Sequence, residues 1–402
     1  MKIFFVALFL LLSLPAAAQQ DVETARRTIA SIENLLKERP NDPTLWFYLS
    51  RFRAEAGERA ASVAALEKVL ELGEGFLPTR DGFEKVWDDK AFQATRAKLE
   101  AKLPRLDYAP VALQLDDNTI IPEGIAYDTH WRSVFMGSVA QKRIFRIDFT
   151  NTVTEFAGKG MGLDSVLGLA VDSPRRVLYA VSTNAVTAEG EAKRRNAIFA
   201  FDVDNARLLR RIDVPGAQQL NDVAVAPGGR VFATDSASGA VFEIPKEGEP
   251  RQVVPPNVIR GSNGLAASAD AKRLYVAHST GLVSVDLASG AVTRMRIPER
   301  ETVAAIDGLY EWQGQLVGVQ NITTPGRVIL MTLSPDGQSV TRVQTLLSHH
   351  HNQLNEPTTG AVTERGFYLL AATGVAHYNR EGKIERPDTL PKPTVLRIPL
   401  PR

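Results

Sequence analysis

No cysteine occurs anywhere in the chain, which excludes a disulfide framework and a lipid-modified cysteine. Neither charge is in excess, since 47 Lys and Arg residues stand against 46 Asp and Glu residues. Without a basic surplus, binding to nucleic-acid phosphates or to an anionic lipid surface has no electrostatic drive. Beyond the first residues, no apolar run approaches the ~20 residues of a membrane-spanning helix. We therefore expect no nucleic-acid partner and no membrane span.

The N-terminus has the three parts of a secretory signal peptide. Lys2 supplies a positive charge, an apolar stretch runs from Ile3 to Leu14, and Ala16-Ala17-Ala18 forms a small-residue cleavage site. The sequence therefore predicts that residues 1–18 are a signal peptide and that the mature protein is periplasmic or secreted.

Residues 19–104 have the apolar spacing of helices. Steps of three and four separate the apolar residues from Val22 to Leu36, and Pro40 to Pro43 ends that helix and begins another. A pattern of Trp, Leu, Gly and small residues from Trp46 is typical of one tetratricopeptide unit, and a degenerate helix pair follows. One or two tetratricopeptide units rarely fold alone. We therefore expect this helical domain to dock on the next domain. It is either a structural cap or a groove for a partner protein.

Residues 105–402 consist of short β-branched runs separated by Gly, Pro and Asp turns. Six similar tetrapeptides each open an apolar strand, and they begin at Glu123, Leu167, Asn221, Asn263, Asp307 and Thr359. Successive starts lie 44, 54, 42, 44 and 52 residues apart, close to the ~40 to 50 residues of a four-stranded propeller blade. The sequence predicts a mainly β fold: a six-bladed β-propeller preceded by a small α-helical, tetratricopeptide-like domain.

The residues that open the first strands should form a ring at one mouth of the propeller channel. Four of them carry carboxylate or amide oxygens: Glu123, Asn221, Asn263 and Asp307. Two carboxylates at such a mouth would repel each other and lose hydration unless a cation lay between them. Calcium takes about six to eight oxygens of this kind, whereas zinc and copper favour the Cys and His side chains that the ring lacks. We predict a calcium site, with magnesium or another divalent cation as the alternative.

Four blade openings carry a family resemblance. "PEGIAYD" at Glu123, "LNDVAVAPGGRVFATDS" at Asn221, "SNGLAASADAKRLYVAHS" at Asn263 and "IDGLYEWQGQLVGVQN" at Asp307 resemble successive blades of the gluconolactonase, senescence marker protein and luciferin-regenerating enzyme family, relatives of the paraoxonases. The resemblance implies that Glu123, Asn263 and Asp307 hold a divalent metal, usually calcium, and that Asn221 contacts metal or substrate. It also implies hydrolysis of a lactone or ester.

Hydrolysis needs a group that accepts the proton of the attacking water. The family's usual carboxylate role would fall to Asp307. The ends of the second strands should return to the same mouth, which adds Asp235 and His278 as candidates, and imidazole has the more suitable ordinary pKa of ~6.5. These three residues are the predicted catalytic groups.

Three residues are predicted to contact substrate: Gln219, Asn221 and Asn321. Gln219 stands where sugar-lactone members of the family have arginine, which argues against a polyhydroxylated sugar lactone. Asp222 follows Asn221 where other blades have Gly, and it is a candidate to hold Asn221 in place or to face a neighbouring blade.

The leading hypothesis is an exported, calcium-dependent hydrolase that acts on a small-molecule lactone or ester. The alternative is a non-catalytic, metal-stabilised propeller that binds a ligand or, through the helical domain, a partner protein. An oxidoreductase of the sugar-dehydrogenase type is a weaker third hypothesis, because no cofactor signature supports it.

Overall fold

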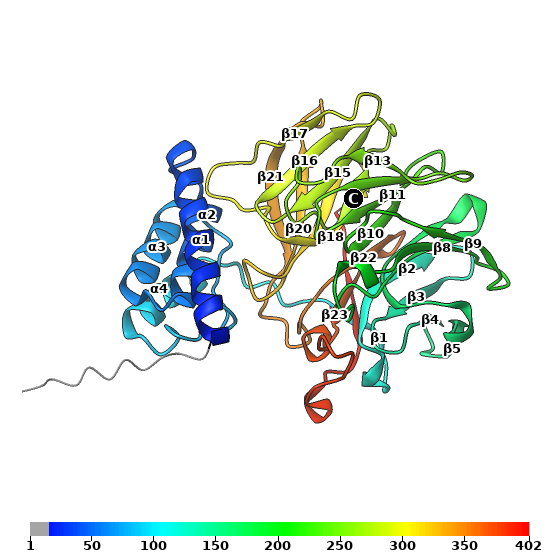
Figure 1. Cartoon of the computed structure of the whole chain (residues 1–402), viewed down its shortest axis with the longest axis horizontal. Coiled ribbons are helices and arrows are strands. Elements are labelled where there is room, and N and C mark those ends of the chain that lie inside the picture. The colour runs from blue at the N-terminus through cyan, green and yellow to red at the C-terminus, as the bar shows by residue number, and fades with distance from the viewer. Residues whose placement is uncertain (1–15, 402) are drawn as a thin grey trace, which may run out of the picture. The chain divides into compact units, whose positions relative to one another are not determined.

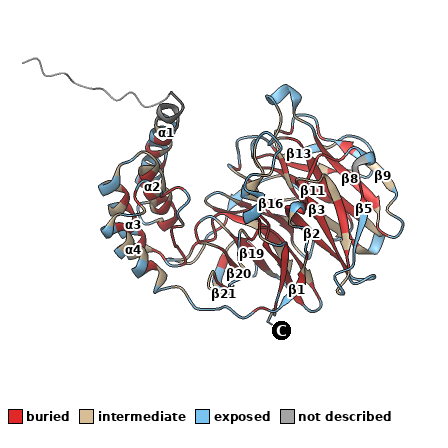
Figure 2. Cartoon of the chain, turned by 90° about the horizontal axis from the view of Figure 1, so that it is seen from below, coloured by how far each residue is buried: buried red, intermediate tan, exposed pale blue. Residues whose placement is uncertain are grey.

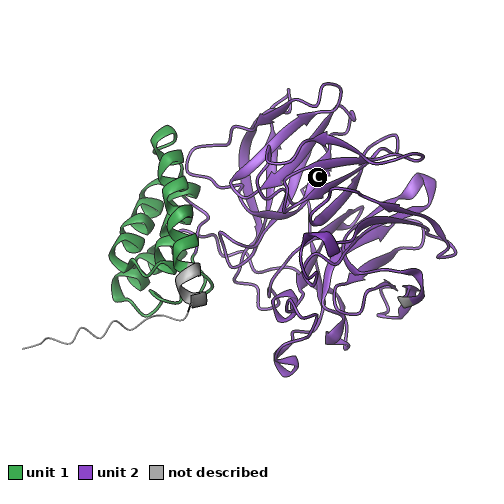
Figure 3. Cartoon of the chain, viewed as in Figure 1, with its two compact units in different colours: residues 1–73, 78–101 green, residues 74–77, 102–402 purple. Residues whose placement is uncertain are grey.

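The computed structural model describes residues 16–401, and its chain divides into two compact units (Figure 3). The first unit comprises residues 1–73 and 78–101, and the second comprises residues 74–77 and 102–402. Residues 1–15, which hold most of the predicted signal peptide, lie outside the described residues. In the part of the chain that is described, no helix is both long enough and apolar enough to cross a membrane.

The first unit contains four helices (Figure 1): α1 (Ala16–Glu38), α2 (Pro43–Glu55), α3 (Arg59–Leu72) and α4 (Lys90–Glu100). Helix α2 begins as predicted, because the Asp42 carboxylate accepts hydrogen bonds from the backbone N–H groups of Thr44 and Leu45 and Pro43 follows it. An apolar cluster joins α1, α2 and α3. The first three predicted helices are therefore confirmed, whereas the helix pair predicted from Phe83 to Leu103 is wrong, because turns precede a single helix, α4, in that range. The tetratricopeptide assignment stays a prediction.

The second unit is a six-bladed β-propeller, as predicted, and each blade is a four-stranded antiparallel sheet. The strands of each blade are given from the channel outward. The first blade consists of β2 (Pro122–Asp128), β3 (Ser133–Ser138), β4 (Arg143–Ile147) and β5 (Val153–Ala157), and the second of β6 (Ser165–Asp172), β7 (Val177–Thr183), β8 (Asn196–Asp202) and β9 (Leu208–Asp213). The third consists of β10 (Leu220–Val225), β11 (Val231–Asp235), β12 (Val241–Ile244) and β13 (Arg251–Val254).

The next two blades are β14 (Leu265–Ala267), β15 (Arg273–His278), β16 (Gly281–Asp286) and β17 (Val292–Arg294), then β18 (Ile306–Trp312), β19 (Gln315–Gln320), β20 (Arg327–Leu333) and β21 (Val340–Leu347). The sixth blade closes the ring. It contains β22 (Gly360–Thr363), β23 (Gly366–Ala372), β24 (Thr394–Ile398) and, as its outermost strand, β1 (Val111–Gln114) from the start of the unit. Val111 pairs with Leu396 in this closing ladder.

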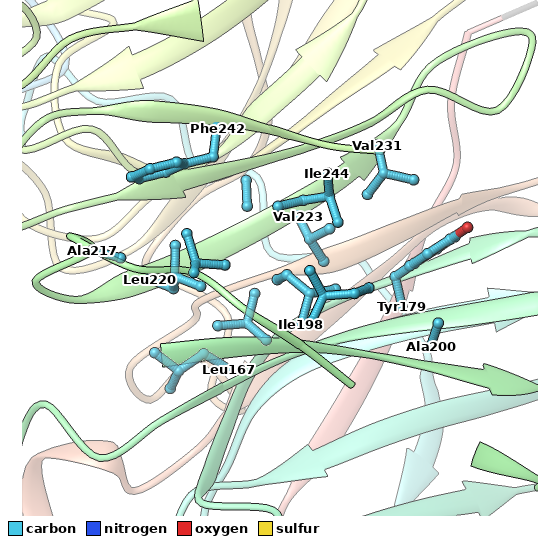
Figure 4. Packing of buried hydrophobic residues seen from close by; sticks show 14 of the residues in the cluster. Leu167, Tyr179, Ile198, Ala200, Ala217, Leu220, Val223, Val231, Phe242 and Ile244 are labelled. Carbon is cyan, nitrogen blue, oxygen red and sulfur yellow. The ribbon is translucent and has the colours of Figure 1, made fainter. Parts of the chain in front are cut away.

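The propeller core lies between the blades, where the strands are buried and the turns exposed (Figure 2). Figure 4 shows one such interface, in which Tyr179 and Ile198 of the second blade pack with Val223 and Ile244 of the third. Because the sheets stack face to face around the axis, each blade positions its neighbour's first strand. The positions of the channel residues are therefore set by apolar packing.

A short segment, Glu74–Leu77, also belongs to the propeller unit although it precedes α4 in the chain. The Glu74 backbone N–H donates to the Arg300 carbonyl at 2.6 Å, and the Leu77 backbone N–H donates to the Thr323 carbonyl at 2.9 Å. Gly75 lies against the buried Arg327, so close that an added Cβ would be 2.5 Å from the Arg327 Nη1 atom. The segment thus covers a buried cation of the fifth blade.

Candidate metal centre

The six first strands begin side by side because glycines let neighbouring backbones touch. A Cβ at Gly124 would lie 2.9 Å from the Leu167 carbonyl carbon of the second blade, and one at Gly264 would lie 2.6 Å from the Leu309 nitrogen of the fifth. Similar approaches occur at Gly168 and Gly308. The hydroxyls of Thr358 and Thr359 both donate to the Glu123 carbonyl at 2.8 Å, which joins the sixth blade to the first. The predicted ring of strand openings is therefore present at the channel mouth.

Three of the four predicted metal ligands converge in this ring. Glu123 is 8% exposed, and among the described residues its Oε2 atom has no hydrogen-bond partner. Asp307 accepts a side-chain hydrogen bond from Asn263 and lies close enough to Glu123 to affect its ionisation. Asn263 and Asp307 are only partly buried, so the oxygens of this group face the mouth.

The fourth predicted ligand, Asn221, is held with a defined orientation. Its Nδ2 atom donates to the Ser236 Oγ at 2.7 Å, and that hydroxyl donates to the Ser262 carbonyl at 2.6 Å. A serine hydroxyl has one hydrogen, which is already used, so Ser236 can only accept from Asn221. The amide nitrogen therefore faces Ser236, and the amide oxygen of Asn221 is the atom left for a cation or a substrate.

The carboxylates of the ring are difficult to ionise in the absence of a cation. Burial, followed by the negative charges of Asp307 and Asp222, raises the pKa of Glu123 well above its ordinary value. Removal of water by surrounding protein raises the pKa of Asp307 to about 6, although hydrogen bonds from Asn321 and Asn263 lower it. A hard divalent cation would relieve this repulsion and would complete the bonding of the Glu123 Oε2 atom. The donor set of two carboxylates and two amides fits calcium.

Asp222 stands at the one ring position where the other five blades have glycine: Gly124, Gly168, Gly264, Gly308 and Gly360. Its Oδ1 atom accepts from the Val223 backbone N–H at 2.8 Å, and its carboxylate also accepts from the Leu265 backbone. Asp222 is therefore bonded to the backbone of the third and fourth blades, and among the described residues its carboxylate accepts no hydrogen bond from the Asn221 side chain. Burial raises its pKa to about 7, and the charge of Asp307 adds to that shift.

The three predicted catalytic residues are in different surroundings. The Asp307 carboxylate lies in the ring of oxygens, with its Oδ2 atom 2.6 Å from the Asn321 Nδ2 donor. Asp235 is fully buried and accepts four backbone N–H bonds at 2.6 to 3.1 Å, from residues 218, 219, 237 and 238. His278 accepts from the Thr280 backbone N–H at its Nδ1 atom, at 3.3 Å, within its own hairpin. The hydrogen bonds of Asp235 and His278 to backbone N–H groups stabilise the surrounding loops. Catalytic roles for these two residues stay predictions.

The predicted substrate contacts also differ from one another. Asn321 donates to Asp307 and, at 3.1 Å, to the Pro357 carbonyl, so its amide group orients a ring carboxylate. Gln219 is partly buried, and its backbone N–H is bonded to Asp235 at 2.9 Å. Of the three predicted contacts, Asn221 is the one in the ring itself.

A long connection between β23 and β24, residues 373–393, was not identified from the sequence as part of the site. We call it the roof segment. Leu390 belongs to the apolar cluster that contains Ile121 and Leu167, and Tyr378 packs against this cluster while its hydroxyl bonds the Ser165 side chain. Its sequence signal is its length, since among the described residues it is the longest connection between consecutive strands of one blade. With Glu123 and Leu167 each 8% exposed and Asp307 partly exposed, the mouth is most open beside the third to fifth blades.

The fold and this site together define a six-bladed β-propeller with acid and amide side chains gathered at one end of its channel. The structure is similar to that of a gluconolactonase from Xanthomonas campestris, with a TM-score of 0.50 and 18% identity, over 74% of this chain and 91% of that one. It is also similar to the PQQ-bound aldose sugar dehydrogenase of Streptomyces coelicolor, with a TM-score of 0.50 and 15% identity, over 74% and 99% of the two chains. The predicted resemblance to gluconolactonases is thus confirmed at the level of the fold.

Sequence comparison gives a narrower match. Protein cueball of Drosophila grimshawi is 30% identical over 184 residues, which cover 42% of this chain. The matched region spans 28% of the length of that relative. No family model matches the sequence.

Proposed function

We propose that this protein is an exported, calcium-dependent hydrolase of lactones or esters. The observation that carries the proposal is the convergence of Glu123, Asn263 and Asp307 at one end of the channel, with a buried Glu123 oxygen that has no hydrogen-bond partner in the described part of the chain. The gluconolactonase-like fold is compatible with this chemistry but does not select it, because propellers host many functions.

The residues of the ring divide the work between binding and proton transfer. Glu123, Asn221, Asn263 and Asp307 would hold the calcium ion. When bound, such an ion polarises a substrate carbonyl and lowers the pKa of an attacking water. Asp307 is the candidate base whose carboxylate lies among these oxygens, so it would accept the proton of that water. Asn321 and Asn263 both donate side-chain hydrogen bonds to the Asp307 carboxylate, so this group would be held in place for that role.

The test is a panel of aliphatic and aromatic lactones and esters, assayed with calcium and with a chelator. We expect turnover that needs the metal and that Asp307→Asn and Glu123→Gln each abolish. Glu243→Gln is a matched control, because Glu243 lies on β12 and pairs with Arg230 and Arg251. Metal-independent turnover, or no turnover across the panel, contradicts the proposal.

The second candidate is a non-catalytic propeller in which the metal only stabilises the ring. It is favoured by one observation: Asp235 and His278, two of the three candidate bases, make structural hydrogen bonds to backbone N–H groups. Calcium would then raise the melting temperature of the protein without any hydrolysis. Recruitment of a partner by the helical unit belongs to this alternative.

A further inference from the structure

A small cavity lies where the outer part of the sixth blade meets the first blade. Its volume is about 170 Å³, and seven residues line it: Pro110, Val111, Ala112, Phe149, Arg365, Tyr368 and Arg397. Most drug-sized ligands occupy larger sites, of about 300 to 1,000 Å³. The cavity therefore suits a ligand of about one ring with one polar group. We call it the blade-junction cavity.

The blade-junction cavity lies away from the ring of strand openings. Arg365 stands in the turn between β22 and β23, at the opposite end of β22 from the ring residue Thr359. Phe149 stands in the turn between β4 and β5, at the same end of its blade. None of the predicted metal ligands lines the cavity. It is therefore a separate site from the metal centre.

Aromatic rings form one wall of the cavity. Tyr368 is 2% exposed, and its ring centroid lies 5.3 Å from that of Phe149 and 6.0 Å from that of Tyr127, on which it stacks. Tyr368 pairs with Arg397 between β23 and β24, and the Arg397 backbone N–H donates to the Pro110 carbonyl at 2.9 Å. This aromatic wall is therefore held in place by packing and by the strand ladder.

Two guanidinium groups border the aromatic wall. Arg365 donates a side-chain hydrogen bond to the Tyr368 hydroxyl. Burial raises the pKa of Tyr368, and the positive charges of Arg365 and Arg397 oppose that shift, so both guanidinium groups lie near the hydroxyl. The neighbouring acid, Glu364, accepts a hydrogen bond from the Tyr127 hydroxyl at 3.3 Å. Among the residues that the structure describes, no Asp or Glu side chain forms an ion pair with either arginine.

A planar carboxylate matches this pair of arginines. A guanidinium group presents its donors in a planar fork that fits both oxygens of a carboxylate. The Tyr368 hydroxyl accepts its bond from Arg365 and keeps its own hydrogen to donate. The rest of the lining carries no charge: Pro110, Val111, Ala112 and Phe149. An inorganic anion would leave this apolar surface uncovered, whereas an aromatic ring would cover it.

We propose that the blade-junction cavity binds a small aromatic carboxylate, with its carboxylate group between Arg365 and Arg397 and its ring against Phe149 and Pro110. The inference goes beyond the proposed hydrolysis and does not depend on it. Binding at this site needs no metal ion, because the arginines supply the positive charge.

The experiment is calorimetric titration of the full chain at pH 7 and low ionic strength with benzoate and, in parallel, with benzamide and acetate. Benzamide has the ring without the charge, and acetate has the charge without the ring. We expect one saturable benzoate site per chain and at least about tenfold weaker binding of the other two compounds. Added salt should weaken benzoate binding, because it screens the charges. Benzamide or acetate binding as tightly as benzoate, or no benzoate binding at millimolar concentration, overturns the inference.

Variants of the two arginines locate the site. Arg365→Gln and Arg397→Gln should each weaken benzoate binding at least about tenfold. Both arginines are exposed, so the variants should fold, and their melting temperatures check this. Arg342→Gln, at an exposed position on β21, is the matched control and should bind benzoate normally. Unchanged benzoate binding in both cavity variants overturns the inference.

A chelator separates this site from the metal centre, where a bound calcium ion can also attract a carboxylate. We expect the same benzoate affinity with calcium, with chelator and in Asp307→Asn. Benzoate binding that the chelator abolishes overturns the inference and assigns the carboxylate to the metal centre. Benzoate binding at the arginines of a protein that hydrolyses nothing would contradict the proposed function and leave this site intact.

Discussion

The Asn321 side chain donates from its Nδ2 atom to the Asp307 Oδ2 atom at 2.6 Å and to the Pro357 carbonyl oxygen at 3.1 Å. Both acceptors lack a hydrogen of their own, so only the amide nitrogen can face them, and the orientation of the amide is determined. The bond also stabilises the ionised form of Asp307 and so lowers its pKa. Asn321 is therefore a positioning residue for the proposed base.

Replacing this donor should change the pH dependence of hydrolysis. In Asn321→Leu, Asp307 loses a bond that lowers its pKa, so its pKa rises and the acid limb of the pH–rate profile moves to higher pH. We also expect kcat to fall about 10- to 100-fold with a smaller change in KM. Ile322→Ala, at the adjacent exposed position, is the control. An unshifted acid limb would show that Asn321 does not act through Asp307.

Calcium should stabilise the folded protein. At about 100 times its dissociation constant, an ion bound only by the native state adds roughly 2.7 kcal/mol to the free energy of unfolding. Glu123→Gln removes one of the two ring carboxylates and should abolish most of that gain, while Glu243→Gln should keep it. Thermal melts with increasing calcium measure the effect. The same calcium response in both variants would place the ion elsewhere.

The metal-free protein should lose stability as the pH rises from about 5 to 8. The pKa values of Asp307 and Asp222 are raised to about 6 and about 7, so the folded state binds protons that the unfolded state has already released near pH 4. The contribution of these two carboxyl groups to the free energy of unfolding is therefore fully present below pH 4. It declines as the pH rises through the folded pKa values, by a few kcal/mol in all. Urea denaturation with a chelator at pH 5 and pH 8 measures the decline.

The control for this pH effect is Asp222→Asn, which should flatten the pH dependence of the free energy of unfolding. Acids with lowered pKa values, such as Asp204 at about 2, lose their contribution at lower pH and do not enter the window. Calcium should stabilise more strongly at pH 8 than at pH 5, because ionised carboxylates bind it better. Stability that rises between pH 5 and pH 8 without metal would contradict the explanation.

Gly75→Ala should destabilise the propeller. Gly75 has φ of +77°, and an added Cβ would lie 2.5 to 2.7 Å from the guanidinium atoms of Arg327. That guanidinium is held by Gln320 at 2.7 Å and by the Thr302 carbonyl at 3.1 Å, so it has little room to move. We expect a loss of roughly 2 to 3 kcal/mol. Gly248→Ala, with φ of +82° and no atom near its Cβ, isolates the backbone cost, and equal losses in both variants would disprove the clash.

The part of the site that repeats along the sequence could be predicted from the sequence. Glu123, Asn221, Asn263 and Asp307 occupy the same place in the first, third, fourth and fifth blades, so blade spacing was enough to bring them to one mouth. The local surroundings of Asp235 were not predictable in this way, because its four N–H donors come from two loops that only the folded blade brings together.

The roof segment shows the same limit over a longer distance. Leu390 belongs to the same apolar cluster as Ile121 and Leu167, which lie more than 200 residues earlier in the chain. The roof segment has no repeated sequence pattern from which this packing could be predicted. The sequence also does not show which blade receives the first and the last strand of the propeller unit. Both lie in the sixth blade, where β1 pairs with β24.

That closing ladder, with Val111 beside Leu396, means that the sixth blade cannot be completed until β24 has been synthesised. Until then the first five blades form an incomplete ring whose end sheets are exposed to solvent. Contacts between residues so far apart in the sequence form slowly. Loss of β24 would therefore leave a chain that cannot close the propeller and that is prone to aggregate while it folds.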